Sequence, residues 1–579
     1  MTEITKSITY LNEYKSLKKA VDEGKTPVLT VGLSAIHKAN LAAAFGADTA
    51  RPVLVLTDDD NAANRFAADL RGFSEREVVV LPPRELVMAD VAGVSRGYEQ
   101  ARLAALDTLS GACFAVASVQ AAAQRTMPPA LLASSIVTLK AGEEAPLDEL
   151  THRLTDAGYE RCSQVEGMGQ FSVRGGILDI FPPQAEHPYR VEFWDDEIDS
   201  ISTFDVGSQR RLEQCETLRC LPCMEALPSL AKGGAAGLAK AVAALASSRR
   251  KKQHAELQKN LERDAERLRE SGTLPAADKY LPLIYPQMAT AFDYLPENTL
   301  ILIEDTPRLR DAARDFHARI ADDVTALMER GELPGGMDGY ALDFAGICSI
   351  KRQIVRMDSF LNSIPELAPQ HLENFVANQM NAYGGNLDMA SADIRSYTEQ
   401  GRAVAVVCGS TLRCKNMFDA LTDSGLKVQL SDLLPKGGCV NIMEGMISAG
   451  FEYPDLGLVV MTEGQVLARR KKAKVKRSNR DRVKSFTDLS PGDLVVHEHH
   501  GIGRFIGMER MTVDGSERDF IKIAFAGTDF LYVPATSLDL ISKYLGSGDT
   551  ERVRLNRLGG TDWTKAKARA KAAAKELAD

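Results

Sequence analysis

Short β-branched runs alternate with alanine-rich stretches over residues 1 to 138. The apolar runs lie at Pro27 to Val31, Val53 to Thr57, Val78 to Leu81 and Phe114 to Val119. The helical stretches lie at Lys38 to Phe45, Ala62 to Gly72 and Gly97 to Leu109. Strand, helix and strand in this order predict a parallel sheet covered by helices.

The pattern changes over residues 139 to 224. Here "GQFSVRGGILDIFPP" and "HPYRVEFWDDEIDSISTFD" predict short strands joined by Gly and Pro turns, and therefore an antiparallel module. Alternation with period two directs one set of apolar side chains toward a core. These are Phe171, Val173, Val191 and Phe193.

The opposite face of this module has the composition of a protein interface. Alternation places Arg190, Glu192 and Trp194 there, and Arg174 faces outward from the neighbouring strand. Tryptophan beside arginine on a solvent-side strand is typical of an interface hot spot. In the competing interpretation, Trp194 covers a second core under the helical segment 225 to 272.

Helical and α/β patterns return after the module. The segment 225 to 272 is interpreted as a solvated amphipathic helical region, with Leu257, Leu261, Ala265 and Leu268 on one face. The run "ENTLILIEDTP" predicts a buried strand that rejoins the first sheet. A second α/β unit follows at 375 to 466, with strands at Ala403 to Cys408 and Leu458 to Thr462.

Residues 489 to 547 predict a small all-β module with many Gly turns. Ile521, Ile523 and Phe525 share one face of a strand, so that face is apolar. The module has five basic and eight acidic residues, which disfavours phosphate binding and favours a protein partner. A barrel this small invites strand-edge pairing with another sheet.

Composition adds a cellular context and one sharp local feature. The 579 residues suffice for about three to five domains, and the net charge of −9 argues against a surface that wraps nucleic acid throughout. No apolar run approaches the roughly 20 residues of a membrane span, so a cytoplasmic protein is expected. However, Leu467 to Thr487 carries ten Lys or Arg against one acid. Such a run predicts an extended linker, with contact to DNA as the alternative.

Two clusters suggest metal chemistry but do not carry it. Cys220-x-x-Cys223 could begin a zinc site, yet no second close pair follows, and buried thiols are favoured. His497-Glu498-His499-His500 ends a strand at a turn, whereas zinc proteases place their histidines on a helix. Alternation would direct His497 and His499 to one face and His500 to the other. No metal site and no catalytic residue is predicted.

A broken phosphate-binding loop follows the first strand. Gly32 to Ala39 has the right spacing and keeps Lys38, but the second glycine is His37 and the Mg²⁺-binding hydroxyl is the methyl of Ala39. An imidazole and a Cβ would occupy the phosphate channel. Carboxylates at Glu304 and Asp305 follow a buried strand but cannot restore the loop. The segment is therefore predicted to be inactive in ATP hydrolysis.

The longer motifs resemble those of the bacterial transcription-repair coupling factors, the Mfd family. Residues 485 to 563, with "LSPGDLVVHEHHGIGRFIG", "DFLYVPATSLDLISKYLG" and "LNRLGGTDW", resemble the RNA polymerase-interacting domain and the linker after it. "GQFSVRGGILDIFPP…YRVEFWDDEIDSISTFD…SQR" resembles the UvrA-binding module that this family shares with UvrB. Motif order and spacing agree over essentially the whole chain.

The resemblance implies a multidomain α/β plus all-β fold. A degenerate RecA-like domain (1 to 138 and 225 to 355) would hold the inserted UvrA-binding module (139 to 224). A small α/β domain (375 to 466), a basic linker (467 to 487) and a Tudor/CarD-like β-barrel (488 to 547) would follow. Residues 548 to 579 would form a linker helix toward a translocase motor, and the lack of a C-cap signal suggests that residue 579 lies inside a helix.

The resemblance also implies site residues. The UvrA contacts would be Arg174, Arg190 and Trp194, although the aromatic residue is Phe in an aligned family member, and the polymerase contact would include Met511. The expected role is to bind RNA polymerase stalled at DNA damage, through its β subunit, and to recruit UvrA. The chain itself would be monomeric and use no cofactor. ATP, Mg and most contacts with double-stranded DNA would belong to the motor. The alternative is a free-standing polymerase-binding regulator without a motor.

Overall fold

The computed structural model divides into two compact units, Met1–Ala468 and Arg469–Asp579, which are described separately. The described residues are 2–88, 96–247, 255–337, 339–380, 382–384, 386–433, 437–467, 492–497, 500–513, 516–527, 529–534, 541–543 and 555–556. The predicted basic linker, from residue 468 on, and nearly all of the predicted linker helix lie outside them. Among the described residues, no helix has the length and apolarity needed to cross a bilayer.

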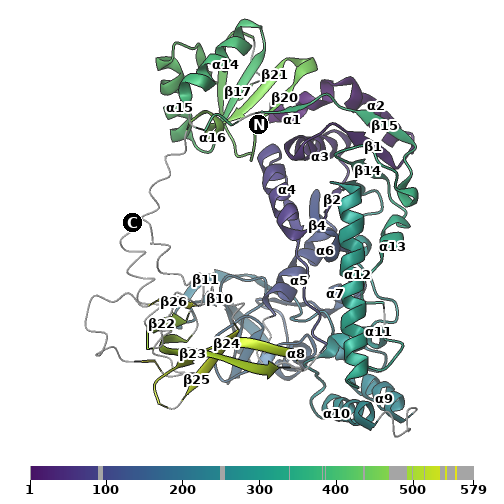
Figure 1. Cartoon of the computed structure of the whole chain (residues 1–579). Coiled ribbons are helices and arrows are strands. Elements are labelled where there is room, and N and C mark those ends of the chain that lie inside the picture. The colour runs from purple at the N-terminus through teal and green to yellow at the C-terminus, as the bar shows by residue number, and fades with distance from the viewer. Residues whose placement is uncertain are drawn as a thin grey trace. The chain divides into compact units, whose positions relative to one another are not determined.

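A seven-stranded parallel sheet organises the first unit (Figure 1). Its strands, in the spatial order β15-β1-β14-β13-β2-β4-β3, come from both sides of the antiparallel module. The bounds are β1 Val28–Val31, β2 Val53–Thr57, β3 Val78–Leu81, β4 Phe114–Ser118, β13 Leu300–Ile303, β14 Ile354–Met357 and β15 His371–Asn374. Because β13 pairs with β2, the prediction that "LILI" rejoins the first sheet is confirmed.

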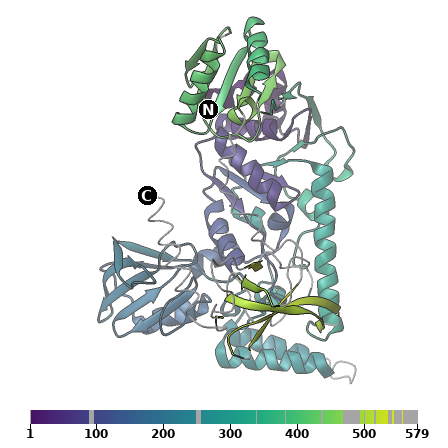
Figure 2. The same ribbon diagram turned by 60° about the vertical axis from the view of Figure 1, so that its left-hand side comes forward.

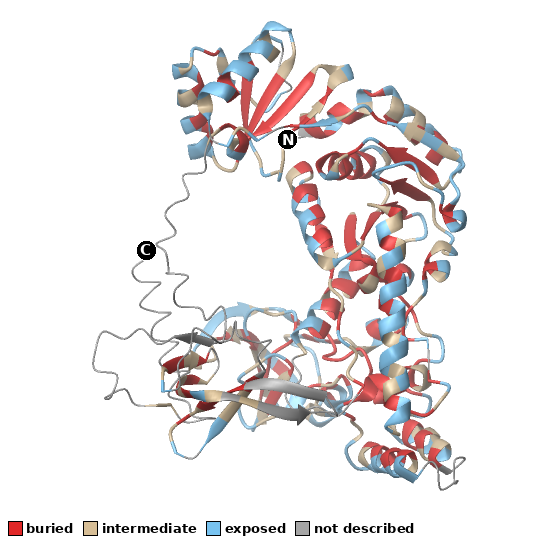
Figure 3. Ribbon diagram, viewed as in Figure 1, coloured by how far each residue is buried: buried red, intermediate tan, exposed pale blue. Residues whose placement is uncertain are grey.

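Helices cover both faces of this sheet, as predicted for a parallel sheet (Figure 3). Along β13, Leu300 and Leu302 join one core, whereas Ile301 and Ile303 join the other. The first core is covered by α1 Thr2–Ser7, α2 Asn12–Asp22, α3 Ala35–Thr49 and α4 Asp60–Phe73. The second is covered by α5 Gly97–Leu109, α6 Val119–Ala123 and α12 Thr306–Glu329.

The predicted antiparallel module is a six-stranded sheet beside the parallel one (Figure 2). Its order is β11-β10-β9-β8-β7-β6, and only the β6–β7 pair among the described strands of this sheet is parallel. The bounds are β6 Glu160–Arg161, β7 Gln170–Arg174, β8 Ile177–Ile180, β9 Tyr189–Trp194, β10 Glu197–Phe204 and β11 Arg211–Cys215. A second small sheet pairs β5 Val137–Lys140 with β12 Thr217–Cys220, next to α8 Leu147–Asp156.

The inner face of the module shares a core with the parallel sheet and the helices that follow. Phe171 and Val191 are fully buried, and Val173 and Phe193 pack against the same core. The amphipathic prediction is confirmed, because Leu257, Leu261, Ala265 and Leu268 are buried on α10. The remaining helices here are α7 Pro129–Ser135, α9 Gly234–Ser247, α10 Ala255–Ser271, α11 Leu281–Ile284 and α13 Phe344–Cys348.

The second α/β unit, residues 375 to 466, packs directly on the domain that contains the parallel sheet. Both belong to the compact unit Met1–Ala468. The sheet of the second α/β unit has the order β16-β20-β21-β17-β19-β18 and includes the two strands predicted from the sequence. The bounds are β16 Asn378–Gln379, β17 Ala403–Cys408, β18 Val428–Leu430, β19 Val440–Glu444, β20 Phe451–Tyr453 and β21 Leu458–Thr462, with α14 Leu387–Glu399, α15 Thr411–Asp423 and α16 Glu463–Val466. Ala405 and Val407 join the core beneath α3 and α4, whereas Val404 and Val406 face the unit's own helices.

The second compact unit contains a five-stranded antiparallel sheet in the order β25-β24-β23-β22-β26. The bounds are β22 Leu494–His497, β23 Gly501–Val513, β24 Ser516–Ala524, β25 Phe530–Pro534 and β26 Ile541–Lys543. The predicted apolar face is confirmed, since Ile521, Ile523 and Phe525 are buried together with Val495 and Phe505.

One prediction for the histidine cluster is wrong. The rings of His497 and His500 lie 4.8 Å apart instead of facing opposite sides. The reason is that β22 ends at His497, which pairs with Gly501 at the start of β23, so strand alternation does not extend to His500. Glu498 and His499 lie outside the described residues.

Candidate protein-binding face and the closed nucleotide loop

Strand register brings the predicted contact residues to one face of the antiparallel sheet. Arg190 on β9 lies directly opposite Asp179 on β8, and Asp179 lies opposite Ser172 on β7. The neighbouring positions Leu178 and Val191 point the other way and are fully buried. The sheet formed by the strands β7 to β10 therefore has an apolar inner face and a polar outer face.

A single carboxylate holds both arginines of this face. Arg190 donates from Nε to Asp179 Oδ1 at 2.7 Å and from Nη2 to Oδ2 at 2.9 Å. Arg174 donates from Nη2 to the same Oδ2 at 2.7 Å. Only 1% of the Asp179 side chain is exposed. The two predicted contact residues are thus brought together by a third residue that the sequence reasoning did not select.

The two arginines differ in how much of them a partner can reach. The guanidinium of Arg190 stacks on the Phe204 ring at 4.6 Å and also donates to the Gln209 side chain, and 15% of the Arg190 side chain is exposed. Arg174, by contrast, is 50% exposed. The hydrogen bond to Asp179 raises the pKa of Arg190 further. Arg190 therefore lies on the predicted outer face, and Asp179 and Phe204 cover most of its side chain.

Trp194 ends β9 and projects into solvent. It is 81% exposed, and the turn to β10 begins at Asp195, which has φ +59°. The competing interpretation, in which Trp194 covers a second core, is therefore wrong. Beside it, Glu192 forms an ion pair with Arg211 and accepts a hydrogen bond from Ser200 Oγ at 3.2 Å. A large exposed aromatic side chain next to fixed charges fits a protein contact.

The segment predicted as a broken nucleotide loop is closed by neighbouring chain. Gly32 has φ +85°, and a Cβ built there would lie on the carbonyl oxygen of Phe375. Backbone thus occupies the space in front of the loop. Ala39 is fully buried on α3. Its methyl group cannot coordinate Mg²⁺, as the hydroxyl at this position of a phosphate-binding loop does.

Lys38 and His37 are both withdrawn from solvent at this loop. Lys38 is 4% exposed, and its Nζ donates to the backbone oxygen of Glu304 at 2.5 Å. Burial lowers the pKa of Lys38 and raises that of the Glu304 carboxyl. The His37 ring lies 5.3 Å from Phe451 and 5.2 Å from Tyr453, both on β20.

Burial also changes the chemistry of His37 at this contact. It lowers the pKa of the ring to about 4. The loop thus serves as a contact between the two α/β units, which Tyr453 strengthens by donating to Asn40 Oδ1 at 2.8 Å.

A buried ionic network lies where the module joins the parallel sheet. Arg84 contacts Asp278 at 2.7 Å and Glu225 at 3.0 Å, and Arg102 contacts Glu225 at 3.2 Å. Glu99 accepts a hydrogen bond from the Glu225 backbone N–H at 2.7 Å. No single stretch of sequence indicates this cluster, because its members are scattered over nearly 200 positions.

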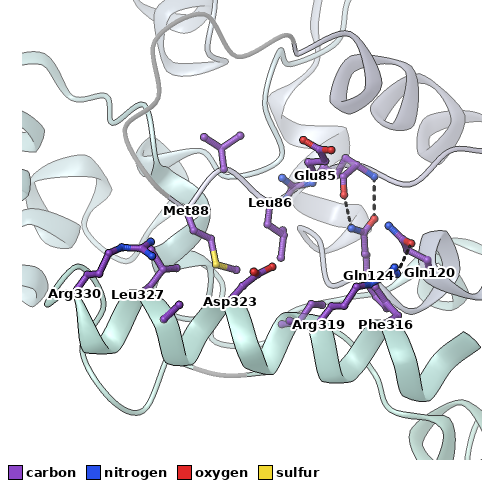
Figure 4. A pocket seen from close by; sticks show the side chains of 14 residues that line it. Glu85, Leu86, Met88, Gln120, Gln124, Phe316, Arg319, Asp323, Leu327 and Arg330 are labelled. Atoms are coloured by element: carbon purple, nitrogen blue, oxygen red, sulfur yellow. Dashed lines mark hydrogen bonds between the residues drawn. The ribbon is translucent and has the colours of Figure 1, made fainter. Parts of the chain in front are cut away.

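A cavity of about 680 Å³ opens between the segment 84 to 88 and α12 (Figure 4). Leu86, Met88 and Leu327 give it an apolar side, whereas Arg319 and Asp323 charge its rim. Its lining combines both charge signs with apolar side chains, so its composition selects no ligand class.

The remaining predicted residues are placed as follows. Cys220 and Cys223 are buried, and burial raises the pKa of the Cys220 thiol to about 12. Within the described residues, no group of three or more His, Cys, Asp or Glu side chains is arranged to hold a metal ion. Met511 lies on β23 opposite Arg518, and its side chain lies outside the described set.

Comparison with known families assigns both β modules. Residues 137–225 match the UvrB interaction domain family, and residues 489–545 match the CarD-like/TRCF RID domain family. These matches define the class of the chain as a multidomain protein that carries both kinds of interaction domain.

Over its whole length, the chain is homologous to transcription-repair-coupling factors, which confirms the resemblance inferred from its motifs. It is 30% identical over 594 residues to the factor of Bacillus subtilis, with 100% of this chain and 50% of that protein covered. It is 26% identical over 596 residues to the factor of Staphylococcus aureus, again with 100% and 50% covered. For the Staphylococcus epidermidis factor, the identity is 27% over 577 residues, with 96% and 48% covered. The chain spans about half the length of the curated relatives it matches.

Proposed function

We propose that this chain couples transcription to nucleotide excision repair as a two-ended adaptor. One end binds RNA polymerase stalled at DNA damage, and the other recruits UvrA. The observation that carries the proposal is that both interaction domains occur on one chain that is homologous throughout to transcription-repair-coupling factors. An adaptor needs two recognition surfaces and no catalytic centre of its own.

At the UvrA end, the proposed contacts are Arg174, Arg190 and Trp194. Their common face on the UvrB interaction domain and the 81% exposure of Trp194 support this assignment. Aromatic and arginine side chains supply most of the binding energy in many protein interfaces. The Trp194 ring is the anchor in this proposal, and the arginines make the face attractive to acidic groups of UvrA.

At the polymerase end, the RID domain binds the β subunit, with Met511 as one apolar contact. The outer strands β25 and β26 of its sheet support a mode in which a partner strand adds to an edge. The net acidity of this region disfavours DNA as its direct ligand.

The remaining parts of the family's activity are assigned outside these residues. In this proposal the adaptor uses no cofactor, and ATP, Mg²⁺ and most DNA contacts belong to a translocase motor that releases the stalled polymerase. The closed loop at Gly32 supports the absence of nucleotide binding in this domain. The protein works in the cytoplasm as a monomer.

The UvrA assignment is tested by measuring binding of purified UvrA to the full chain by biolayer interferometry. Trp194→Ala should weaken binding at least about tenfold, as expected for a hot-spot residue. Phe360→Ala is the matched control, because Phe360 is 82% exposed but lies on the parallel-sheet domain. Equal affinity of the Trp194 variant and the wild type would refute the assignment.

The polymerase assignment is tested in a two-protein assay with the purified β subunit. Met511→Arg should weaken binding by burying an unpaired charge in an apolar contact. Met389→Arg, at a 59% exposed methionine on α14, is the control and should bind like wild type. A Met511 variant that also binds like wild type would remove this contact from the proposal.

The motor is tested by reading the encoding gene beyond codon 579. An in-frame GxxxxGKT segment within a helicase-like region supports the adaptor half of a translocase. A stop codon at that point supports the free-standing regulator instead.

A further inference from the structure

We propose that Asp179 is the positioning residue of the UvrA-binding face, and that Arg174 rather than Arg190 makes the direct contact with a carboxylate of the partner. This inference rests on the proposed function of the face. It assigns different tasks to two arginines that the sequence motif presents as equivalent.

The Asp179 carboxylate links the two arginines of the face. It is buried in the middle strand β8, and both of its oxygens accept hydrogen bonds, two from Arg190 and one from Arg174. Charge-assisted and bidentate contacts of this kind fix the plane of a guanidinium as well as its position. The arginines are therefore ordered before any partner arrives, which reduces the entropy lost on binding.

Arg190 has little left to offer a partner. Its Nε and Nη2 are both bound to Asp179, its flat side rests on Phe204, and Gln209 contacts it from the outside. The side chain links β8, through Asp179, to the loop after β10, through Gln209. Its positive charge compensates the buried carboxylate, and without it Asp179 would be a costly uncompensated charge.

Arg174 keeps donors that face solvent. Among the described residues, Asp179 is its only hydrogen-bond partner, through Nη2. The remaining N–H groups of a half-exposed guanidinium form a fork that matches a carboxylate. Two arginines against one aspartate leave the cluster with a net charge of +1, which favours an acidic surface on the partner.

The test uses Asp179→Asn in the full chain, with the affinity for purified UvrA compared with that of the wild type. Positioning and simple electrostatics predict opposite signs. Removal of a negative charge beside an acid-binding face should strengthen binding if charge alone matters. If Asp179 positions the arginines, binding should weaken about tenfold, the scale of one hydrogen bond to a charged group. Affinity equal to or tighter than wild type would overturn the proposal.

A double-mutant cycle separates positioning from general loss of structure. The effect of Asp179→Asn should largely disappear when Arg174 is already Ala, because the positioned group is then absent. Additive effects of the two substitutions would contradict the assignment. Arg190→Lys serves as a second variant if Asp179→Asn does not fold. It keeps the charge but loses the two-bond contact, so binding should fall several-fold, and wild-type affinity would count against positioning.

These outcomes are distinct from failure of the proposed function. If the wild-type chain does not bind UvrA, or if Trp194→Ala has no effect, the face itself is wrongly assigned. If wild type binds and Trp194→Ala weakens binding while Asp179→Asn does not, only the role of Asp179 is wrong.

Discussion

The nucleotide loop and the UvrA-binding face both combine a basic side chain with carboxylates, yet they are opposite in access. At the loop, the Lys38 ammonium donates a hydrogen bond to the backbone oxygen of Glu304, and aromatic rings of β20 pack over the neighbouring His37. On the face, Asp179 is equally buried, but the side chains of Arg174 and Trp194 on the same face are exposed to solvent. A retained basic residue therefore indicates binding only where the fold leaves some of its donors unused.

The comparison also separates two uses of burial. At the loop, burial joins two α/β units and opposes any ligand that needs the same space. On the face, burial of one carboxylate orders side chains that remain exposed. Substitutions at the loop should therefore change stability, and substitutions of exposed side chains on the face, such as Trp194, should change binding with little effect on stability.

Gly32→Ala should have the largest effect, a loss of about 4 kcal/mol in unfolding free energy, from a strained positive φ and a clash with the Phe375 carbonyl. Gly24→Ala is the matched control, since Gly24 has φ +74° but open space around its Cβ position, and should cost about 1 kcal/mol. Urea unfolding followed by circular dichroism measures both. Equal losses would show that the loop is not closed by Phe375.

The second prediction concerns pH. Burial lowers the pKa of His37 from 6.5 to about 4, so the folded chain resists protonation that the unfolded chain accepts. Above pH 6.5 the ring is neutral in both states, so it does not reduce the free energy of unfolding. As the pH falls from 6.5 toward 4, only the unfolded state binds the proton, and the free energy of unfolding decreases. Between pH 7 and pH 5, His37→Gln should reduce the pH-dependent loss by about 2 kcal/mol. Calorimetry across this range measures the slope, with the exposed His317→Gln as control. Parallel slopes for wild type and His37→Gln would be inconsistent with a buried, neutral ring.

A smaller effect is expected for stability on the face. Trp194→Ala should change the unfolding free energy by less than about 0.5 kcal/mol, because most of the side chain is already in water. The same urea experiment measures it. A loss above about 2 kcal/mol would mean that the ring packs against the fold, which would weaken the contrast between the two regions.

No effect is expected from nucleotide at the closed loop. A domain that binds ATP gains about 2.7 kcal/mol at a ligand concentration of 100 times Kd. Addition of ATP and Mg²⁺ to the full chain should leave the melting temperature unchanged. A rise that Lys38→Met abolishes would show that the loop binds nucleotide despite its contacts with Phe375 and β20.

Patterns local in sequence predicted most of the fold. Continuous apolar runs identified β1, β2 and β4, and period-two alternation correctly oriented Val191 on β9. The sequence also indicated that the loop at His37 and Ala39 could not hold phosphate. These features depend on neighbours along the chain, which the sequence displays directly.

Features that depend on distant contacts were missed. Asp179 lies in "GILDIFPP" at an outward position, and its register opposite Arg190 was the signal that could have selected it. The coverage of Arg190 by Phe204 and the packing of β20 on His37 required the folded structure. The network of Arg84, Glu225 and Asp278 joins segments that no periodicity connects.

The order of strands in the parallel sheet has a consequence for how the chain is made. β14 and β13 lie between β1 and β2, but they are synthesised only after the whole antiparallel module. At typical translation rates, the ribosome needs on the order of ten seconds to extend the chain from residue 225 to residue 357. During this interval β1 and β2 lack their central neighbours, and their apolar edges are open to misassembly. The nascent chain should therefore depend on chaperones at this stage. The UvrB-type module differs, because its strands are consecutive in sequence and have all been synthesised by then.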